Sequence, residues 1–243
     1  MTILPFELKF EQHPSLLLAA ITHPTSQSGS HIYVILTQIL QAANQGFDIV
    51  VAPEYSFLPK KGPLNQEELN SLLEILKQSN QNALIIPGTF VWYENDSMYN
   101  TCYVVHKRQV IAEYHKIREG GESRIAYIHN LIPCFGSQTC YFEFRGLKIG
   151  IEICADFGSL IKAGFSDLDL AFLVSYSNSN ADLTFQSLKN GGYVVVNDGD
   201  YWNSLEKRVI VYRKGNGPGR IRTPVNRSEA GRTIQTMLQA HCS

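Results

Sequence analysis

The chain has 243 residues, of which 44% are hydrophobic and 18% charged, and its formal net charge is −1. This composition excludes a disordered chain, and no apolar run approaches the ~18 residues that a membrane-spanning helix needs. The near-neutral charge gives no global reason to expect binding to nucleic acid or to an anionic membrane. We therefore expect a globular protein whose partners include neither.

The N-terminal sequence and the cysteines indicate the compartment. The first residues lack the basic region and the following apolar region of a secretory signal. The five cysteines form no Cys-x-x-Cys pair and have no Cys/His spacing of a zinc site. We therefore expect reduced thiols, a cytoplasmic location and no bound metal.

Apolar patterns in the first part of the chain predict alternating strands and helices. Residues 16–21 form a continuous apolar run, which is typical of a strand buried on both faces. Residues 32–43 carry apolar side chains at helical spacing. The β-rich run at residues 47–54 is broken by Pro53, so Glu54 is predicted at a strand end.

The pattern then changes from alternating elements to consecutive strands. Residues 67–79 predict a second helix and residues 83–91 a third strand. Residues 99–105 and 108–114 predict two strands joined by a short turn. The glycine-containing stretch at residues 118–123 is predicted to be a loop.

A strand and a turn then present Cys154. Residues 141–144 and 147–154 predict a hairpin, and apolar residues occupy every second position of its second strand up to residue 153. Residues 157–159 predict a turn that leads into a helix. This places a thiol at the C-terminal end of a strand, where α/β proteins commonly hold their functional sites.

The rest of the chain predicts two further apolar strands at residues 168–174 and 193–197, with a helix around residues 183–189. No internal repeat or low-complexity linker divides the chain, so we predict a single domain over residues 1–243. The segment from about 201 to 243 is locally basic and is predicted to be a solvated tail.

Four short motifs together carry a family resemblance. They are VAPE at residues 51–54, YNT at 99–101, EYHKI at 113–117 and GLKIGIEICAD at 146–156. In this order and at these separations they resemble the carbon–nitrogen hydrolase (nitrilase) superfamily. The asparagine of the second motif is predicted mainly to hold a turn.

The resemblance implies an α/β fold (α+β in some schemes), a four-layer α-β-β-α sandwich in which Glu54, Lys116 and Cys154 meet at strand ends. A thiol becomes a good nucleophile when a carboxylate takes its proton and a nearby ammonium favours the thiolate. Cys154 would be the nucleophile and Glu54 the general base. Lys116 and the backbone N–H of Ala155 would stabilise the developing negative charge. No step of this chemistry needs a cofactor.

Members of the superfamily also use a second glutamate in the loop after the lysine. This loop offers Glu119 and Glu122, and we favour Glu122 because its neighbours are closer to the family pattern. Tyr55, Tyr176 and Asn178 are predicted to face the substrate, since they follow the base and the strand after the nucleophile.

One departure from the family bears on specificity. Many members carry an arginine and a Pro-Glu pair after the nucleophile motif, whereas residues 157–160 read FGSL. We expect this difference to affect the choice of substrate more than the chemistry.

We therefore predict a cysteine-dependent hydrolase that cleaves a non-peptide C–N bond through a thioester. Its partner would be a small-molecule amide, carbamoyl compound or nitrile, with an amide favoured because amidases dominate the superfamily. Two alternatives remain open. One is a non-catalytic binding or scaffold protein on the same fold, and the other is acyl transfer to an amine or lipid. The resemblance also implies a homodimer or a higher homo-oligomer.

Overall fold

The computed structural model describes residues 3–22, 31–79, 82–177, 181–199, 209–215 and 222–224. The first part of the chain forms β1 (Ile3–Leu8), β2 (Leu16–Ile21), α1 (His31–Asn44), β3 (Ile49–Val51), α2 (Gln66–Lys77), β4 (Leu84–Ile86), β5 (Phe90–Glu94), β6 (Ser97–His106), β7 (Gln109–His115), α3 (Glu122–Ile128) and β8 (Ile132–Pro133). The second part forms β9 (Cys140–Phe144), β10 (Leu147–Ile153), a 3₁₀ turn (Cys154–Asp156), α4 (Ser159–Lys162), β11 (Leu168–Ser175), α5 (Asp182–Gln186), β12 (Leu188–Asp198), β13 (Val209–Lys214) and β14 (Arg222–Pro224).

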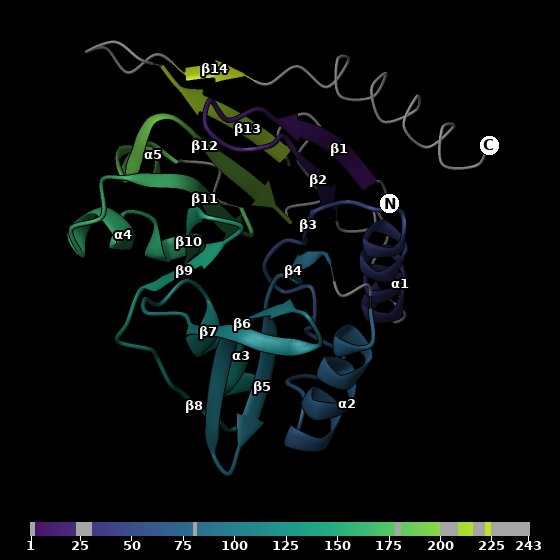
Figure 1. The fold of residues 1–243 in the computed structure, drawn as a ribbon. Coiled ribbons are helices and arrows are strands. Elements are labelled where there is room, and N and C mark those ends of the chain that lie inside the picture. The colour runs from purple at the N-terminus through teal and green to yellow at the C-terminus, as the bar shows by residue number, and fades with distance from the viewer. Residues whose placement is uncertain are drawn as a thin grey trace.

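Two sheets form the middle of the molecule (Figure 1). Within the described residues, the first sheet has the order β1-β2-β3-β4-β6-β5, with β7 and β8 also paired to β6. The second sheet has the order β14-β13-β12-β11-β10-β9. Each sheet is therefore built from one contiguous part of the chain, and strands β2-β3-β4 and β10-β11-β12 run parallel within their sheets.

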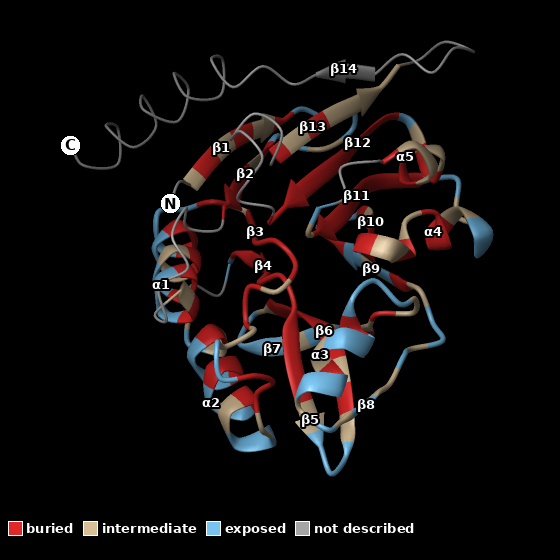
Figure 2. Ribbon diagram, turned by 180° about the vertical axis from the view of Figure 1, so that it is seen from behind, coloured by how far each residue is buried: buried red, intermediate tan, exposed pale blue. Residues whose placement is uncertain are grey.

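Three layers of apolar side chains hold this arrangement together. One core lies between the sheets and contains residues of both, such as Val51 and Ile149. A second core joins the first sheet to α1 and α2, and a third joins the second sheet to α4 and α5. The buried strands and the exposed outer faces of α1 and α2 are visible in Figure 2. The layers follow the order α-β-β-α, as predicted.

Alternation along β10 shows how the sequence produces these layers. Leu147, Ile149, Ile151 and Ile153 all enter the core between the sheets. Gly150 faces the other way, where an added Cβ would lie 2.7 Å from the Leu160 side chain of α4. Each inward isoleucine contributes about 1.5–3 kcal/mol by its burial, which fixes the register because a one-residue slip would expose the whole apolar set.

The predicted single strand at residues 83–91 is wrong. The chain instead forms β4 and β5 with a break between them at Pro87 and Gly88. Gly88 has a φ of +82°, and a Cβ there would lie 2.0 Å from the Pro53 carbonyl oxygen. Glycine is needed at this point because the break packs directly against the backbone that precedes Glu54.

Three further differences concern elements that the sequence patterns missed. Strand β1 precedes the first predicted strand and pairs antiparallel with β2. The predicted loop at residues 118–123 ends early, since α3 begins at Glu122. Within the predicted basic tail, β13 pairs with β12 and so extends the second sheet.

The predicted helix around residues 183–189 is shorter than expected, because α5 ends at Gln186 and β12 begins at Leu188. Residues 16–21, 99–105 and 168–174 form strands as predicted, and the strand predicted at residues 108–114 begins one residue later, at Gln109. Of the helices in the described part of the chain, none is long and apolar enough to cross a membrane.

Candidate active site

Glu54 lies in a buried turn just after β3. Its side chain has no solvent exposure. The next residue, Tyr55, has a left-handed φ of 60°. The backbone N–H of Tyr55 donates to the Thr89 hydroxyl at 2.9 Å. The turn is thus held from the segment between β4 and β5, and the carboxylate points into the molecule.

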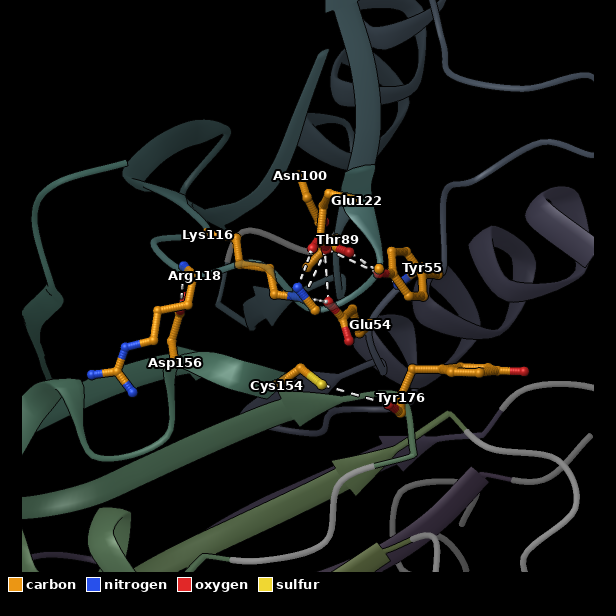
Figure 3. A network of polar contacts seen from close by, with 12 residues as sticks. Glu54, Tyr55, Thr89, Asn100, Lys116, Arg118, Glu122, Cys154, Asp156 and Tyr176 are labelled. Carbon is orange, nitrogen blue, oxygen red and sulfur yellow. Dashed lines mark hydrogen bonds and ion pairs between the residues drawn. The ribbon is translucent and has the colours of Figure 1, made fainter. Parts of the chain in front are cut away.

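Lys116 follows β7 and is fixed at its backbone as well as at its ammonium group. Its N–H donates to the Asn100 carbonyl at 2.9 Å, and its own carbonyl accepts from Gly136 at 2.9 Å. The side chain is 1% exposed. Its Nζ lies 2.7 Å from Oε1 of Glu54 and 2.7 Å from Oε1 of Glu122 (Figure 3). One buried lysine therefore forms ion pairs with two buried carboxylates.

The Asn100 side chain joins the same two carboxylates. Its amide donates to Glu54 at 3.0 Å and to Glu122 at 2.8 Å. Glu122 also accepts from the Tyr55 hydroxyl at 2.9 Å and from the Gly120 backbone N–H at 2.8 Å. With Lys116 included, Glu122 accepts hydrogen bonds from four groups. Two of them, Lys116 and Asn100, also donate to Oε1 of Glu54.

Cys154 reaches this cluster from the opposite sheet. It follows β10 and begins the 3₁₀ turn, with a left-handed φ of 45°. Its thiol donates to the Tyr176 carbonyl at 3.5 Å, and Tyr176 follows β11. Figure 3 shows the thiol on the side of the cluster where Glu54 lies. The site is thus assembled between the two sheets, at the C-terminal ends of their parallel strands.

The two glutamates differ in their pKa values because they differ in their partners. Burial raises the pKa of Glu54 to about 7, even though the Lys116 charge opposes the shift. Burial acts in the same direction on Glu122, but Lys116 and Asn100 outweigh it and the pKa of Glu122 is lowered. Burial alone would lower the pKa of Lys116, but the two carboxylates raise it. Glu122 and Lys116 therefore stay charged at neutral pH, while Glu54 can exchange a proton.

The thiol is protonated at rest. Burial, reinforced by the negative charge of Glu54, raises the pKa of Cys154 to about 12. The interaction between Cys154 and Glu54 contributes to both pKa values. The arrangement therefore suits transfer of the sulfur proton to Glu54 during attack on a substrate, rather than a resting thiolate.

Most of the predicted site residues come together. Ala155 lies in the turn next to the thiol. The Tyr55 and Tyr176 rings pack edge to face with centroids 5.7 Å apart. Glu119 does not contact the lysine; it is exposed and accepts from Gly121 and Ser123 at the start of α3. Asn178 lies outside the described residues.

Sequence reasoning underestimated Asn100, which contacts both carboxylates rather than only holding a turn. The signal was available, because asparagine is depleted in strands and this one lies in a strand-forming run. Asp156 belongs to a motif that predicts no role for it, yet it accepts hydrogen bonds from three groups around Lys116. Among the described residues, no cluster of His, Cys, Asp or Glu side chains could hold a metal ion.

Comparisons with solved structures support the fold. An amidase from Nesterenkonia sp. shares 15% identity with a TM-score of 0.59, over 90% of this chain and 94% of the amidase. A variant of the Nesterenkonia sp. AN1 amidase, with the acetamide moiety of fluoroacetamide added covalently at its active-site cysteine, shares 13% identity with a TM-score of 0.60, over 92% of this chain and 95% of that one.

The glutamine-dependent NAD+ synthetase of Acinetobacter baumannii is also similar, with 20% identity and a TM-score of 0.52, over 70% of this chain. This chain covers 35% of the synthetase, so the likeness concerns one part of a longer protein. No curated protein sequence gives a significant match. The carbon–nitrogen hydrolase family model matches residues 17–159, which is more than half of the chain and contains Glu54, Lys116 and Cys154. The protein therefore belongs to the carbon–nitrogen hydrolase family of the nitrilase superfamily.

Proposed function

We propose that the protein is a hydrolase of small-molecule amides, with Cys154 as nucleophile and Glu54 as general base. The observation that carries the proposal is the buried cluster in which one lysine joins two glutamates beside a thiol. A structural ion pair would need only one carboxylate for charge balance. Here burial, helped by the charge of the second carboxylate, raises the pKa of Glu54 to about 7, as a general base requires.

The first chemical step forms a bond between sulfur and the amide carbon. Glu54 takes the thiol proton as Sγ of Cys154 attacks, so no free thiolate accumulates in the buried site. The carbonyl π electrons move to oxygen and create an oxyanion. The Lys116 ammonium and the Ala155 backbone N–H stabilise this charge.

The second step breaks the C–N bond and leaves a thioester. Glu54, now protonated, donates its proton to the nitrogen, which departs as ammonia or an amine. Glu54 then removes a proton from water, whose oxygen attacks the thioester carbon. Collapse of this intermediate releases the carboxylic acid and returns the proton to sulfur. The net reaction consumes one amide and one water.

Within this proposal, Glu122 keeps its charge throughout. Its four donors include Lys116 and Asn100, which also contact Glu54. Glu122 thereby fixes both groups and its charge helps to raise the pKa of Glu54. The covalent adduct described for the cysteine of the Nesterenkonia amidase supports an amide as the substrate class.

The proposal is tested by screening small amides, carbamoyl compounds and nitriles for ammonia release. The Cys154→Ala variant is expected to lose more than ~10³-fold in kcat, because it lacks the thiol that forms the proposed thioester. The matched control is Cys134→Ala, which alters a half-buried cysteine outside the cluster and should retain the activity. Full ammonia release by Cys154→Ala would exclude the proposed mechanism.

A further inference from the structure

The nucleophile and its partners lie on different sheets, so some contact must hold the sheets in register at the site. Glu54 and Lys116 follow β3 and β7 of the first sheet, and Cys154 follows β10 of the second. Apolar packing between sheets tolerates small sliding movements, whereas hydrogen bonds to a buried carboxylate fix direction and distance. Around the nucleophile turn, several polar contacts cross from one sheet to the other.

Asp156 makes such a contact from the last position of the 3₁₀ turn. The residue has no solvent exposure. Its Oδ2 accepts from the Ile117 backbone N–H at 3.0 Å and from the Tyr114 hydroxyl at 2.8 Å, and its Oδ1 accepts from the Arg118 N–H at 2.8 Å. All three donors belong to the segment that surrounds Lys116.

The segment that follows Lys116 also donates hydrogen bonds to the nucleophile turn. The Arg118 guanidinium donates to the Ala155 carbonyl at 3.3 Å and to the Phe157 carbonyl at 3.5 Å. The turn that carries the nucleophile is therefore bound at three successive residues to the backbone and side chain that follow the lysine. Figure 3 shows Asp156 and Arg118 side by side, beyond Lys116 and away from Glu54.

We propose that Asp156 is a positioning residue that holds the Cys154 turn against the Lys116 segment and so sets the reactivity of the thiol. It does not touch the reacting atoms. It acts through the left-handed backbone at Cys154, whose φ of 45° is unfavourable for a residue with a Cβ and persists only where surrounding contacts impose it. This inference rests on the proposed function, because it assumes that Cys154 is the nucleophile.

Asparagine at this position cannot reproduce the contacts. In either orientation of the amide, its NH₂ group faces the backbone N–H of Ile117 or of Arg118, and two donors cannot form a hydrogen bond. We expect Asp156→Asn to displace the turn and to slow alkylation of Cys154 by iodoacetamide at least tenfold at pH 7. In the unaltered protein the alkylation rate should rise with pH near neutrality, as Glu54 ionises. Asp156→Asn should lose this rise, because the thiol would no longer transfer its proton to Glu54.

A matched control comes from the same stretch of chain. Glu152 also has no solvent exposure and lies two residues before Cys154. It accepts from the Leu160 N–H at 2.8 Å and from the Ser159 and Thr184 hydroxyls, all within its own half of the molecule. Glu152→Gln removes a buried charge of the same kind without touching the first sheet. Its alkylation rate and pH profile should match those of the unaltered protein.

The measurement is peptide-level mass spectrometry of alkylation at Cys154 and Cys134 from pH 5 to 9, with thermal unfolding as a check on folding. Equal Cys154 rates and profiles in Asp156→Asn and the unaltered protein would overturn the inference and leave the proposed function standing. A slowing in Glu152→Gln equal to that in Asp156→Asn would also overturn it, since the effect would then be general destabilisation.

If Asp156→Asn does not fold, Tyr114→Phe decides the question. This variant removes one of the three donors, and we expect it to slow Cys154 alkylation several-fold; an unchanged rate overturns the inference. In the unaltered protein, a Cys154 no more reactive than Cys134 would overturn the proposed function, and the inference with it. Failure of the positioning role is thus distinguishable from failure of the chemistry.

Discussion

A single buried lysine between two glutamates gives the two carboxylates different properties. Glu122 binds four donors and keeps its charge, whereas burial leaves Glu54 with a raised pKa. The difference arises from geometry, since both residues are glutamates and both contact Lys116 at 2.7 Å. The number of additional donors decides which carboxylate can carry protons.

This asymmetry predicts the acid limb of activity. Glu54 acts as a base only when ionised, and its pKa is raised to about 7. The value of kcat/KM should therefore fall about tenfold per pH unit below neutrality. If Glu54 had an ordinary pKa, the protein would retain its activity well below pH 6. A limb near pH 4.5 in the measured pH–rate profile would contradict the assignment of Glu54 as the base.

A related prediction concerns the direction of a shift. The negative charge of Glu122 helps to raise the pKa of Glu54. Glu122→Gln removes this charge, so that Glu54 becomes the only carboxylate paired with Lys116. The pKa of Glu54 should therefore fall. Alkylation of Cys154 as a function of pH should then show its limb at lower pH than in the unaltered protein. A limb that stays in place or moves to higher pH would show that the two carboxylates are not coupled.

Gly120 shows how closely the lysine is enclosed. A Cβ there would lie 2.7 Å from Lys116 Nζ and 3.4 Å from the Ala155 Cβ. Gly120→Ala should push the ammonium from its two carboxylates and reduce kcat by roughly 10²-fold, the effect of a displacement of about 1 Å. Amide turnover by the purified variant checks this prediction.

The neighbouring glycine provides the control. Gly121 has a φ of 132°, so alanine there strains the backbone, but its Cβ would approach the Tyr55 hydroxyl no closer than 3.6 Å. Gly121→Ala should lower stability and leave the lysine in place. Equal losses of kcat in the two variants would show that strain, and not contact with Lys116, determines the effect.

At the scale of elements, helix α2 lies far along the chain from the nucleophile and has its own N-terminal cap. Asn65 accepts from the Glu68 N–H at 2.9 Å, and Glu68 accepts from the Asn65 N–H at 3.1 Å. Asn65→Ala should lower the free energy of unfolding by about 1 kcal/mol and leave turnover unchanged. Urea denaturation checks this, with the exposed Gln66→Ala expected within about 0.5 kcal/mol of the unaltered protein.

Elements with a strong period were predictable, and those fixed by distant contacts were not. The helix at His31–Asn44 and the strand at Leu147–Ile153 follow from local apolar patterns. The break at Gly88 depends on packing against Pro53, which no local pattern shows. Similarly, the glycine-rich stretch before α3 does not predict a helix that begins at Glu122, whose side chain contacts Lys116 and the Gly120 backbone.

At the scale of the whole molecule, Asn197 forms a second buried tie between the sheets. It lies near the end of β12, and its amide donates to the Ile21 and Val51 carbonyls, both at 3.1 Å. Val51 lies three residues before Glu54, so this tie joins the second sheet to the strand that carries the proposed base. Together with Asp156, it places polar contacts at the base as well as at the lysine.

Asn197→Asp should therefore destabilise the protein more than Asn197→Ala. Alanine loses the two buried hydrogen bonds, at a cost of about 1–3 kcal/mol. Aspartate instead places a buried carboxylate against the same two carbonyls, which adds a further penalty. Unfolding in urea measures both, and an Asn197→Asp protein as stable as Asn197→Ala would contradict this account of the tie.

The residues of the site were more predictable than their contacts. Glu54, Lys116 and Cys154 stand out because each ends a strand within a family motif. The role of Asn100 and the cross-sheet contacts of Asp156 depend on how the two sheets face each other, which sequence periodicity does not encode. The motifs therefore predict the reacting groups of the proposed mechanism, and the fold shows which contacts hold those groups together.

The division of the sheets along the chain also gives the site an order of assembly. In the described residues, the strands of the first sheet end at Pro133 and those of the second begin at Cys140. During synthesis the ribosome therefore releases the carboxylates and the lysine before the cysteine. A chain that has been synthesised only through its first sheet contains Glu54, Lys116 and Glu122 but lacks the proposed nucleophile, Cys154. Under the proposed function, the site is complete only in a chain whose second sheet packs on the first.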